Sequence, residues 1–171
     1  SSAYHHGPDL NLVWRREDLA RIIGLNTDAA ESRATSLFHL HILSLRHAKG
    51  QPIDQVWSQI ETRFLGIVSE LKLSVDLMPV LSEAKQRIQA GCTPDYAASR
   101  GEAIHGVVCA ALLGATYVDA AKIVLFDRHG KLDAARTYAA INAACAGNDR
   151  VVIPGFYGST PTGEVKTFSR G

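Results

Sequence analysis

The sequence predicts a mixed α/β protein, because its two halves follow different hydrophobic patterns. Over residues 15–91, apolar side chains recur every three or four residues, as they do in amphipathic helices. The second half alternates short β-branched runs with helical stretches, which is typical of strand–helix–strand units. A chain of 171 residues is long enough for one sizeable core. We therefore expect one α/β domain with a helical N-terminal half.

Composition excludes several classes of protein. Apolar residues make up 46% of the chain and charged residues 20%, a balance typical of globular domains. The formal net charge of +1 provides no basic field that would attract nucleic acid or anionic lipid. We also expect no membrane span and no signal peptide, since the required apolar runs are missing. The three cysteines form no C-x-x-C pair, so we expect reduced thiols, no zinc site and a cytoplasmic location.

Apolar spacing predicts four helices in the first half, at 15–25, 28–48, 53–71 and 76–90. The clearest signal lies at 53–71, where apolar side chains recur at intervals that fit one helix face. A stripe this wide must be covered by neighbouring elements. Gly91 follows the last of these helices and supplies a left-handed C-cap.

The second half is expected to contain two parallel strands joined by a helix. The helix at 133–146, capped by Asp133, lies between strands at 115–118 and 151–153. The second strand is an unbroken β-branched run, typical of a strand buried on both faces. Around this unit we expect a helix at 99–113 ending at Gly114, an extended piece at 123–126, a turn at 159–163 and a last strand at 165–168.

The loop Pro154–Gly158 follows the second strand of this unit and is a candidate binding edge. In open α/β sheets, ligands bind beyond the carboxyl ends of the strands. Gly155 and Gly158 would let backbone amides approach a ligand closely. An ordinary glycine-containing turn explains the same residues, so spacing alone leaves both interpretations open.

Two charged residues are candidates for binding the charged groups of a ligand. Glu102 could hold an ammonium group near the sheet edge, whereas Ser99, three residues before it, would make the pair a helix capping box. Arg170 could make a two-pronged contact with a carboxylate, or it could be an ordinary solvated arginine. Residue types and spacing do not decide between these interpretations.

Four segments in the second half carry a resemblance to a known family. The segment Asp95–Glu102, which reads DYAASRGE, resembles the SRGE segment of aspartate kinases, and Val118–Ala121 follows at the spacing usual in that family. Residues 154–158, which read PGFYG, look like the PGF-G loop of the family, and residues 166–171 look like the start of its SRGGSD motif. These motifs occur in the family's order over residues 93–171.

The resemblance implies the amino-acid kinase fold, a three-layer α/β/α sandwich, of which this chain would hold a part. It implies transfer of the γ-phosphoryl group of ATP, with Mg²⁺, to the side-chain carboxylate of L-aspartate. The product, 4-phospho-L-aspartate, leads to lysine, threonine and methionine. Carried over residue by residue, Glu102 would bind the ammonium group of the substrate and Arg170 its α-carboxylate, while Gly155 and Phe156 would line the same pocket. The resemblance is also compatible with a homo-oligomer.

Several family motifs are not found in the sequence. It has no KFGGSS segment, it stops within SRGGSD, and it carries no ACT regulatory domain. We therefore expect residues 28–171 to be the substrate-side portion of a catalytic domain, with residues 1–27 unassigned, no catalytic or metal-binding residue, and no activity alone. Two alternatives remain: another amino-acid kinase, such as an acetylglutamate or glutamate 5-kinase, and a non-catalytic amino-acid-binding or interaction module.

Overall fold

The computed structural model describes residues 43, 49–50 and 52–168. The chain divides into two compact units, Ser1–Thr35 and Ser36–Gly171, and every described residue belongs to the second. The helix expected at 15–25 therefore lies outside the described residues, as does all of the helix expected at 28–48 except Leu43, which is helical and fully buried. None of the described helices is long and apolar enough to cross a membrane.

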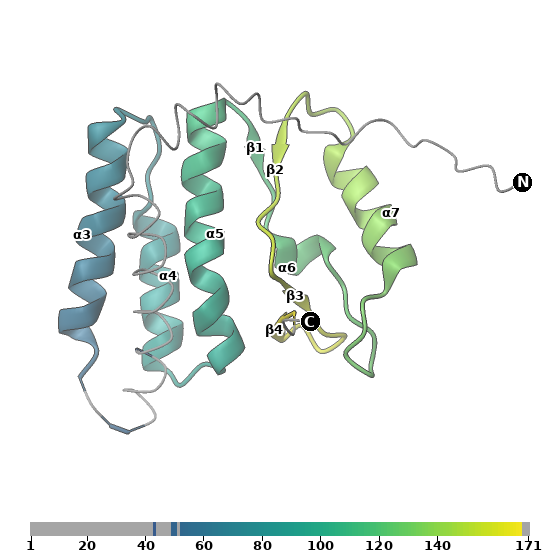
Figure 1. The fold of residues 1–171 in the computed structure, drawn as a ribbon, viewed down its shortest axis with the longest axis horizontal. Coiled ribbons are helices and arrows are strands. Elements are labelled where there is room, and N and C mark those ends of the chain that lie inside the picture. The colour runs from purple at the N-terminus through teal and green to yellow at the C-terminus, as the bar shows by residue number, and fades with distance from the viewer. Residues whose placement is uncertain (1–42, 44–48, 51, 169–171) are drawn as a thin grey trace, which may run out of the picture. The chain divides into compact units, whose positions relative to one another are not determined.

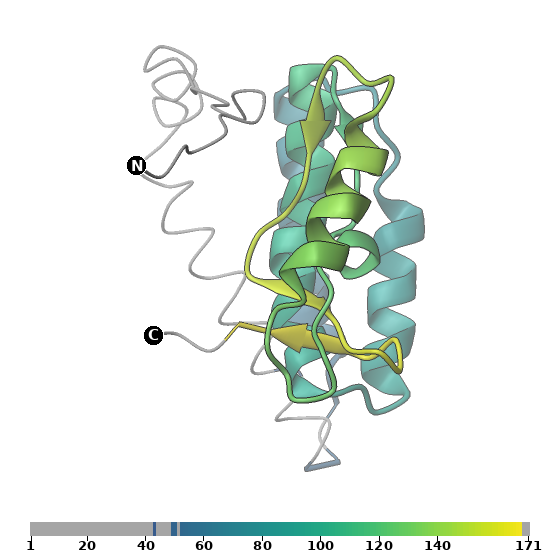
Figure 2. The same cartoon turned by 90° about the vertical axis from the view of Figure 1, so that its right-hand side faces the viewer.

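The described elements form three layers, with helices on both sides of the strands (Figure 1). The first layer contains the helices α3 (Asp54–Glu70), α4 (Met78–Gln89) and α5 (Pro94–Leu113). The middle layer contains the strands β1 (Thr116–Tyr117), β2 (Val151–Val152), β3 (Tyr157–Ser159) and β4 (Val165–Thr167). The third contains α6 (Ala120–Ile123) and α7 (Ala134–Cys145), and Figure 2 shows α7 in front of the first layer. The predicted α/β/α arrangement is confirmed.

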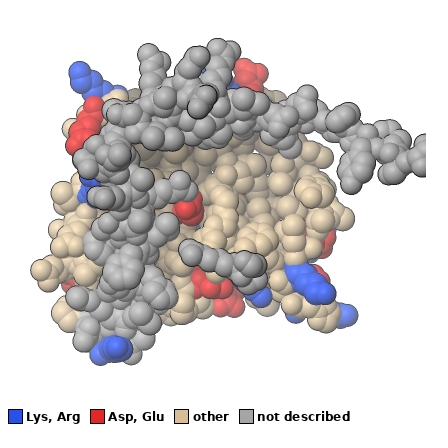
Figure 3. Space-filling view, viewed as in Figure 1, with Lys and Arg blue, Asp and Glu red and all other residues tan. Residues whose placement is uncertain are grey.

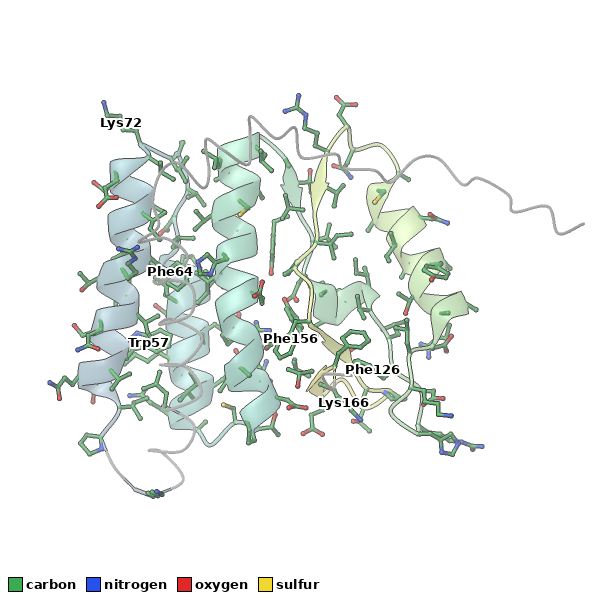
Figure 4. All side chains as sticks on the ribbon, viewed as in Figure 1. Trp57, Phe64, Lys72, Phe126, Phe156 and Lys166 are labelled. Atoms are coloured by element: carbon green, nitrogen blue, oxygen red, sulfur yellow. The ribbon has the colours of Figure 1, made fainter. Side chains whose placement is uncertain are left out.

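The first layer contains the larger of the two buried clusters. Trp57, Ile60 and Phe64 of α3 are almost completely buried, as the periodicity at 53–71 predicts. They pack with apolar residues of the two neighbouring helices, including Leu81, Ala84, Ile88, Ala97, Ile104 and Val108. Figure 4 shows Trp57 and Phe64 directed from α3 toward those helices. The Phe64 ring also meets the His105 ring of α5 edge-on, with centroids 4.8 Å apart. Burial of each such side chain contributes about 1.5–3 kcal/mol.

The parallel pairing predicted for the second half is confirmed. β1 and β2 run parallel, with Thr116 opposite Val151 and Tyr117 opposite Val152. The expectation that β2 is buried on both faces is wrong, because both of its residues are only half-buried. The reason lies in the packing: α5 contacts both strands, whereas α7 packs mainly on α6. The strands are also shorter than the predicted ranges.

Two aspartates determine where the helices of the third layer begin. Asp133 caps α7 as predicted, its Oδ1 accepting a hydrogen bond of 3.1 Å from the amide of Arg136. The extended piece expected at 123–126 is only partly correct, since α6 occupies the first of these positions. Asp119 Oδ1 accepts a 3.0 Å bond from the amide of Ala121 and thereby starts this short helix, which the sequence analysis missed. Of the remaining positions, Leu125 and Phe126 form only isolated β-bridges, to Ser159 and Leu132.

The antiparallel pair of β3 and β4 was not predicted. Tyr157 lies opposite Thr167, and Ser159 lies opposite Val165. Ser159 therefore ends a strand, although the sequence analysis assigned it to a turn. The turn itself begins at Thr160, whose backbone amide donates to the carbonyl of Glu164 over 2.9 Å. This hairpin brings the end of β4 beside the loop that leads into β3.

We expect Phe64→Ala to lower the free energy of unfolding by about 3–5 kcal/mol, because the ring is fully buried and its removal leaves a cavity. The matched control is Leu65→Ala at the next position, where the side chain is 38% exposed and the loss should stay below about 1 kcal/mol. Urea unfolding followed by circular dichroism measures both. Equal losses for the two variants would contradict the placement of Phe64 in the core.

Candidate functional site

Helix α5 carries the candidate residue Glu102, and it begins earlier than the sequence analysis predicted. Thr93 caps the helix, its Oγ1 accepting from the amide of Tyr96 over 3.3 Å, and Pro94 occupies the first helical position. Ser99 therefore lies in the helix interior, where its buried hydroxyl donates to the carbonyl of Tyr96 over 2.7 Å. The capping box of Ser99 and Glu102 is wrong, because neither residue stands at the helix start. Glu102 lies more than two turns into the helix, away from its N-cap.

One stripe of α5, which we call the polar stripe, contains Asp95, Ser99, Glu102 and Gly106. Residues at these intervals lie above one another on one helix face. At the N-terminal end of the stripe, the Asp95 carboxylate accepts two hydrogen bonds from Thr167 of β4. The Thr167 hydroxyl donates to Oδ1 over 2.9 Å, and its backbone amide donates to Oδ2 over 3.2 Å.

The C-terminal end of the polar stripe packs on the strands and on the candidate loop. A methyl group added at Gly106 would lie 2.9 Å from Cε2 of Tyr117 and 3.4 Å from Cγ of Pro154. Only glycine allows α5 to approach β1 and the start of the loop this closely. Glu102 is half-buried and lies one helical turn from Gly106, between the two contacts that join the stripe to the middle layer.

The candidate loop contains a residue with an unusual backbone conformation. Phe156, labelled in Figure 4 near β3, has a φ of 78°, in the left-handed region that side chains other than glycine seldom adopt. Its carbonyl accepts a 2.8 Å hydrogen bond from the amide of Phe168, just after β4. The Phe156 ring is 37% exposed, and the position of a Cβ at Gly155 is surrounded by open space. Strained residues of this kind cluster at binding sites.

Gly158 has a different role from Gly155. It lies within β3, and a Cβ there would collide with the backbone oxygen and side chain of Val124. The neighbouring amide of Ser159 donates to that same oxygen over 2.9 Å. Gly158 therefore allows the segment before α7 to lie directly against β3. Its role is in packing, and the approach of a ligand is not needed to explain it.

The buried residue Tyr157 fixes the end of the loop, and the sequence analysis did not identify it. Tyr157 is fully buried, and its hydroxyl donates to Asp119 Oδ1 over 2.7 Å. Burial, together with the neighbouring Tyr117 and Asp119, raises the pKa of Tyr157, so its hydroxyl stays protonated and remains a donor. Burial likewise raises the pKa of Tyr117. The Asp-Ala-Ala sequence at 119–121 is an N-cap signal that could have indicated this aspartate, whereas nothing nearby in sequence points to Tyr157.

Arg100 links α5 to the same tyrosine. Its side chain is only 6% exposed, and its guanidinium carbon lies 4.5 Å from the ring centroid of Tyr96 and 5.3 Å from that of Tyr157. Nε and Nη2 both donate to Ser99 Oγ, over 3.1 and 3.0 Å. Stacking on two rings compensates in part for the loss of water around the cation. Arg100 thus holds Tyr157, and with it the end of the loop, against α5.

The structure brings three of the segments named in the sequence analysis together. The polar stripe of α5, the loop at 154–158 and the end of β4 are joined by the contacts described above. Gly155 and Phe156 belong to this junction, and Glu102 lies on the stripe that faces it. Arg170 lies outside the described residues, three positions beyond Thr167 in the sequence.

A shallow hollow of about 290 Å³ lies where α4 is joined to α5 and is lined by Arg87, Cys92, Tyr96 and Glu164, among others, but by neither Glu102 nor the loop. No group of three His, Cys, Asp or Glu side chains in the described part of the chain could hold a metal ion. None of the three cysteines, all of which lie in the described residues, forms a disulfide. The face seen in Figure 3 shows no continuous patch of Lys and Arg among the described residues.

Comparison with solved structures finds the same fold in aspartate kinases. The aspartate kinase of Clostridium acetobutylicum is 40% identical with a TM-score of 0.75, and the match covers 78% of this chain and 31% of that one. Aspartokinase III of Escherichia coli, in complex with aspartate and ADP, is 17% identical with a TM-score of 0.62 over 77% of this chain and 35% of that one. Its complex with lysine and aspartate matches over the same shares at 17% identity, with a TM-score of 0.57.

The present chain thus spans about a third of the length of these solved structures. No protein-family model and no curated protein matches it. The two matches to the Escherichia coli enzyme show the fold alone, whereas the clostridial enzyme also shares sequence.

We expect Gly158→Ala to destabilise the fold by about 1–3 kcal/mol, because the added methyl group overlaps the backbone of Val124. Gly155→Ala is the matched control, since open space surrounds its Cβ position, and it should change the free energy of unfolding by less than about 0.5 kcal/mol. Thermal and urea unfolding of the two variants measure this difference. An unchanged free energy of unfolding in Gly158→Ala would show that β3 does not pack against Val124 as described.

Proposed function

This chain is an aspartate-kinase-like segment, and we propose that it forms the part of an aspartate kinase that binds L-aspartate. The observation that carries the proposal is the position of Glu102 on the polar stripe, between the contacts of α5 with the 154–158 loop and with β4. A half-buried carboxylate without a capping role, beside a strained and partly exposed loop, is suited to a cationic group of a ligand. The complex of the Escherichia coli enzyme with aspartate supports this choice of ligand.

The chemistry of L-aspartate matches the residues proposed for its site. Its ammonium group requires an anionic partner, which we assign to Glu102, and its α-carboxylate requires a cationic one, which we assign to Arg170. The backbone at Gly155 and Phe156 lines the same pocket in this proposal. Two fixed charged contacts orient the third group of the amino acid, the side-chain carboxylate, so that it is the group presented to a reaction partner.

We propose that the reaction of the complete enzyme is transfer of the γ-phosphoryl group of ATP to that carboxylate, which forms 4-phospho-L-aspartate. The ADP in the Escherichia coli complex supports a nucleotide as co-substrate. In this proposal the residues of the present chain bind and orient the acceptor carboxylate. A cytoplasmic location is part of the same proposal, and three cysteines outside any disulfide favour it.

The first test is the binding of L-aspartate to the 171-residue chain, measured by isothermal titration calorimetry. We expect saturable binding, which Glu102→Ala should weaken about tenfold or more because a charge-assisted hydrogen bond to the ammonium group is lost. Glu83→Ala is the matched control, since Glu83 stands on the exposed surface of α4. The affinity of this variant for L-aspartate should equal that of the unaltered chain. Unaltered affinity in Glu102→Ala would remove Glu102 from the site.

The second test concerns phosphoryl transfer. With ATP, Mg²⁺ and L-aspartate, we expect the 171-residue chain to form no aspartyl phosphate above a control without protein, as measured with hydroxylamine. The reason is that the sequence contains neither KFGGSS nor a complete SRGGSD segment. Turnover clearly above the control would contradict the assignment of this chain to the acceptor side alone.

A further inference from the structure

The outer edge of β4 is held by a residue to which the proposed function gives no role. In an antiparallel pair, backbone amides alternate between those that face the partner strand and those that face away from it. Thr167 stands opposite Tyr157 in the register, and its amide does not point to β3 but donates to Asp95 Oδ2 over 3.2 Å. The hydroxyl of the same residue donates to Asp95 Oδ1 over 2.9 Å. Both oxygens of one carboxylate therefore bind one residue of β4.

The next residue along the chain connects this contact to the candidate loop. The amide of Phe168 faces the opposite way and donates to the carbonyl of Phe156 over 2.8 Å, which extends the β3–β4 ladder by one bond. Phe156 is the residue with a φ of 78°, a strained conformation that persists only where the surrounding structure holds it. Asp95 thus fixes Thr167, and Phe168 beside it fixes the strained residue of the loop.

Packing on the other side of β4 limits where this segment can move. The ring of Phe168 meets that of Phe126, with centroids 4.8 Å apart. The Lys166 ammonium lies 5.9 Å from the Phe126 ring centroid, and Figure 4 shows Lys166 and Phe126 near each other. These contacts are apolar or weak, and they do not specify the register of β4 against α5. The two hydrogen bonds from Thr167 to Asp95 specify this register, because each has one defined donor and one defined acceptor.

We propose that Asp95 is a positioning residue, which sets the conformation of the 154–158 loop by holding the end of β4 against α5. The effect of Asp95 on ligand affinity rests on the proposed function, because that effect assumes that the loop binds L-aspartate. The carboxylate is required because it offers two acceptors to two donors. An asparagine of the same size offers one acceptor and places an NH₂ group against either the amide or the hydroxyl of Thr167. One residue of α5 would thus align the loop, while Glu102 on the same polar stripe contacts the ligand.

The experiment is amide hydrogen exchange, followed by NMR, on the 171-residue chain and four variants. In Asp95→Asn we expect exchange of the Phe168 amide to accelerate about tenfold or more, while amides of α3 are unchanged. Thr167→Val removes only the hydroxyl and should accelerate exchange less, and Thr167→Ser, which keeps the hydroxyl, should exchange as the unaltered chain does. Asp76→Asn is the matched control, because Asp76 Oδ1 also accepts a backbone amide, that of Met78 at the start of α4, over 2.9 Å. Asp76→Asn should leave the exchange rate of the Phe168 amide unchanged.

Titration of the same proteins with L-aspartate separates this inference from the proposed function. We expect Asp95→Asn to weaken binding about tenfold with α3 still protected, because the loop is no longer held in its binding conformation. Unchanged exchange at Phe168 in Asp95→Asn would overturn the positioning role whatever the chain binds. Faster exchange with unchanged affinity would show that Asp95 holds the loop but would overturn its consequence for affinity, because aspartate would then not require the held conformation. If the unaltered chain bound no aspartate, the proposed function would fail, and the exchange data would still decide the role of Asp95.

Discussion

The structure depends above all on the packing of α5 on both of its sides. Ala97, Ile104 and Val108 belong to the cluster shared with α3 and α4, whereas Tyr96 and Ala103 belong to a second cluster shared with α6, β3 and β4. A helix covered on two different faces cannot rotate or shift without breaking one of the two clusters. The elements α4, β1, β2 and β4 all contact α5 directly. The close approach at Gly106 fixes its distance from the strands.

This double burial also explains why polar residues on α5 indicate function. Burying a polar or charged side chain costs free energy unless it finds a partner, so each such residue in a central helix requires a reason. For Ser99, Arg100 and Asp95 the reason is visible in hydrogen bonds and ring contacts within the chain. Glu102, on the same stripe, is the residue that we propose contacts the ligand. The stripe therefore combines residues that hold the middle layer in place with one that we expect to contact the substrate.

The sequence predicted those elements whose signals are local, and missed those set by distant contacts. The 3.6-residue period of α3 and the Asp133 cap are confirmed, because each depends on neighbouring residues. The parallel β1–β2 pairing is confirmed because the order strand, helix, strand is visible in the sequence and implies it. The capping box was wrong because Thr93-Pro94, a stronger start signal, stands six residues upstream of Ser99. The β3–β4 hairpin is too short to show alternation. The contact of Asp95 with Thr167, 72 residues apart, leaves no pattern in the sequence.

A crystal structure of the 171-residue chain with L-aspartate tests the central claim most directly, since the claim concerns where α5 holds the ligand. The account predicts the ammonium group within hydrogen-bonding distance of the Glu102 carboxylate. It also predicts the amino acid against the backbone of Gly155 and Phe156, with Asp95 still bound to Thr167. An aspartate seated elsewhere, for example in the hollow beside Arg87, would contradict the account. So would a Glu102 carboxylate turned away from a ligand that does occupy the loop.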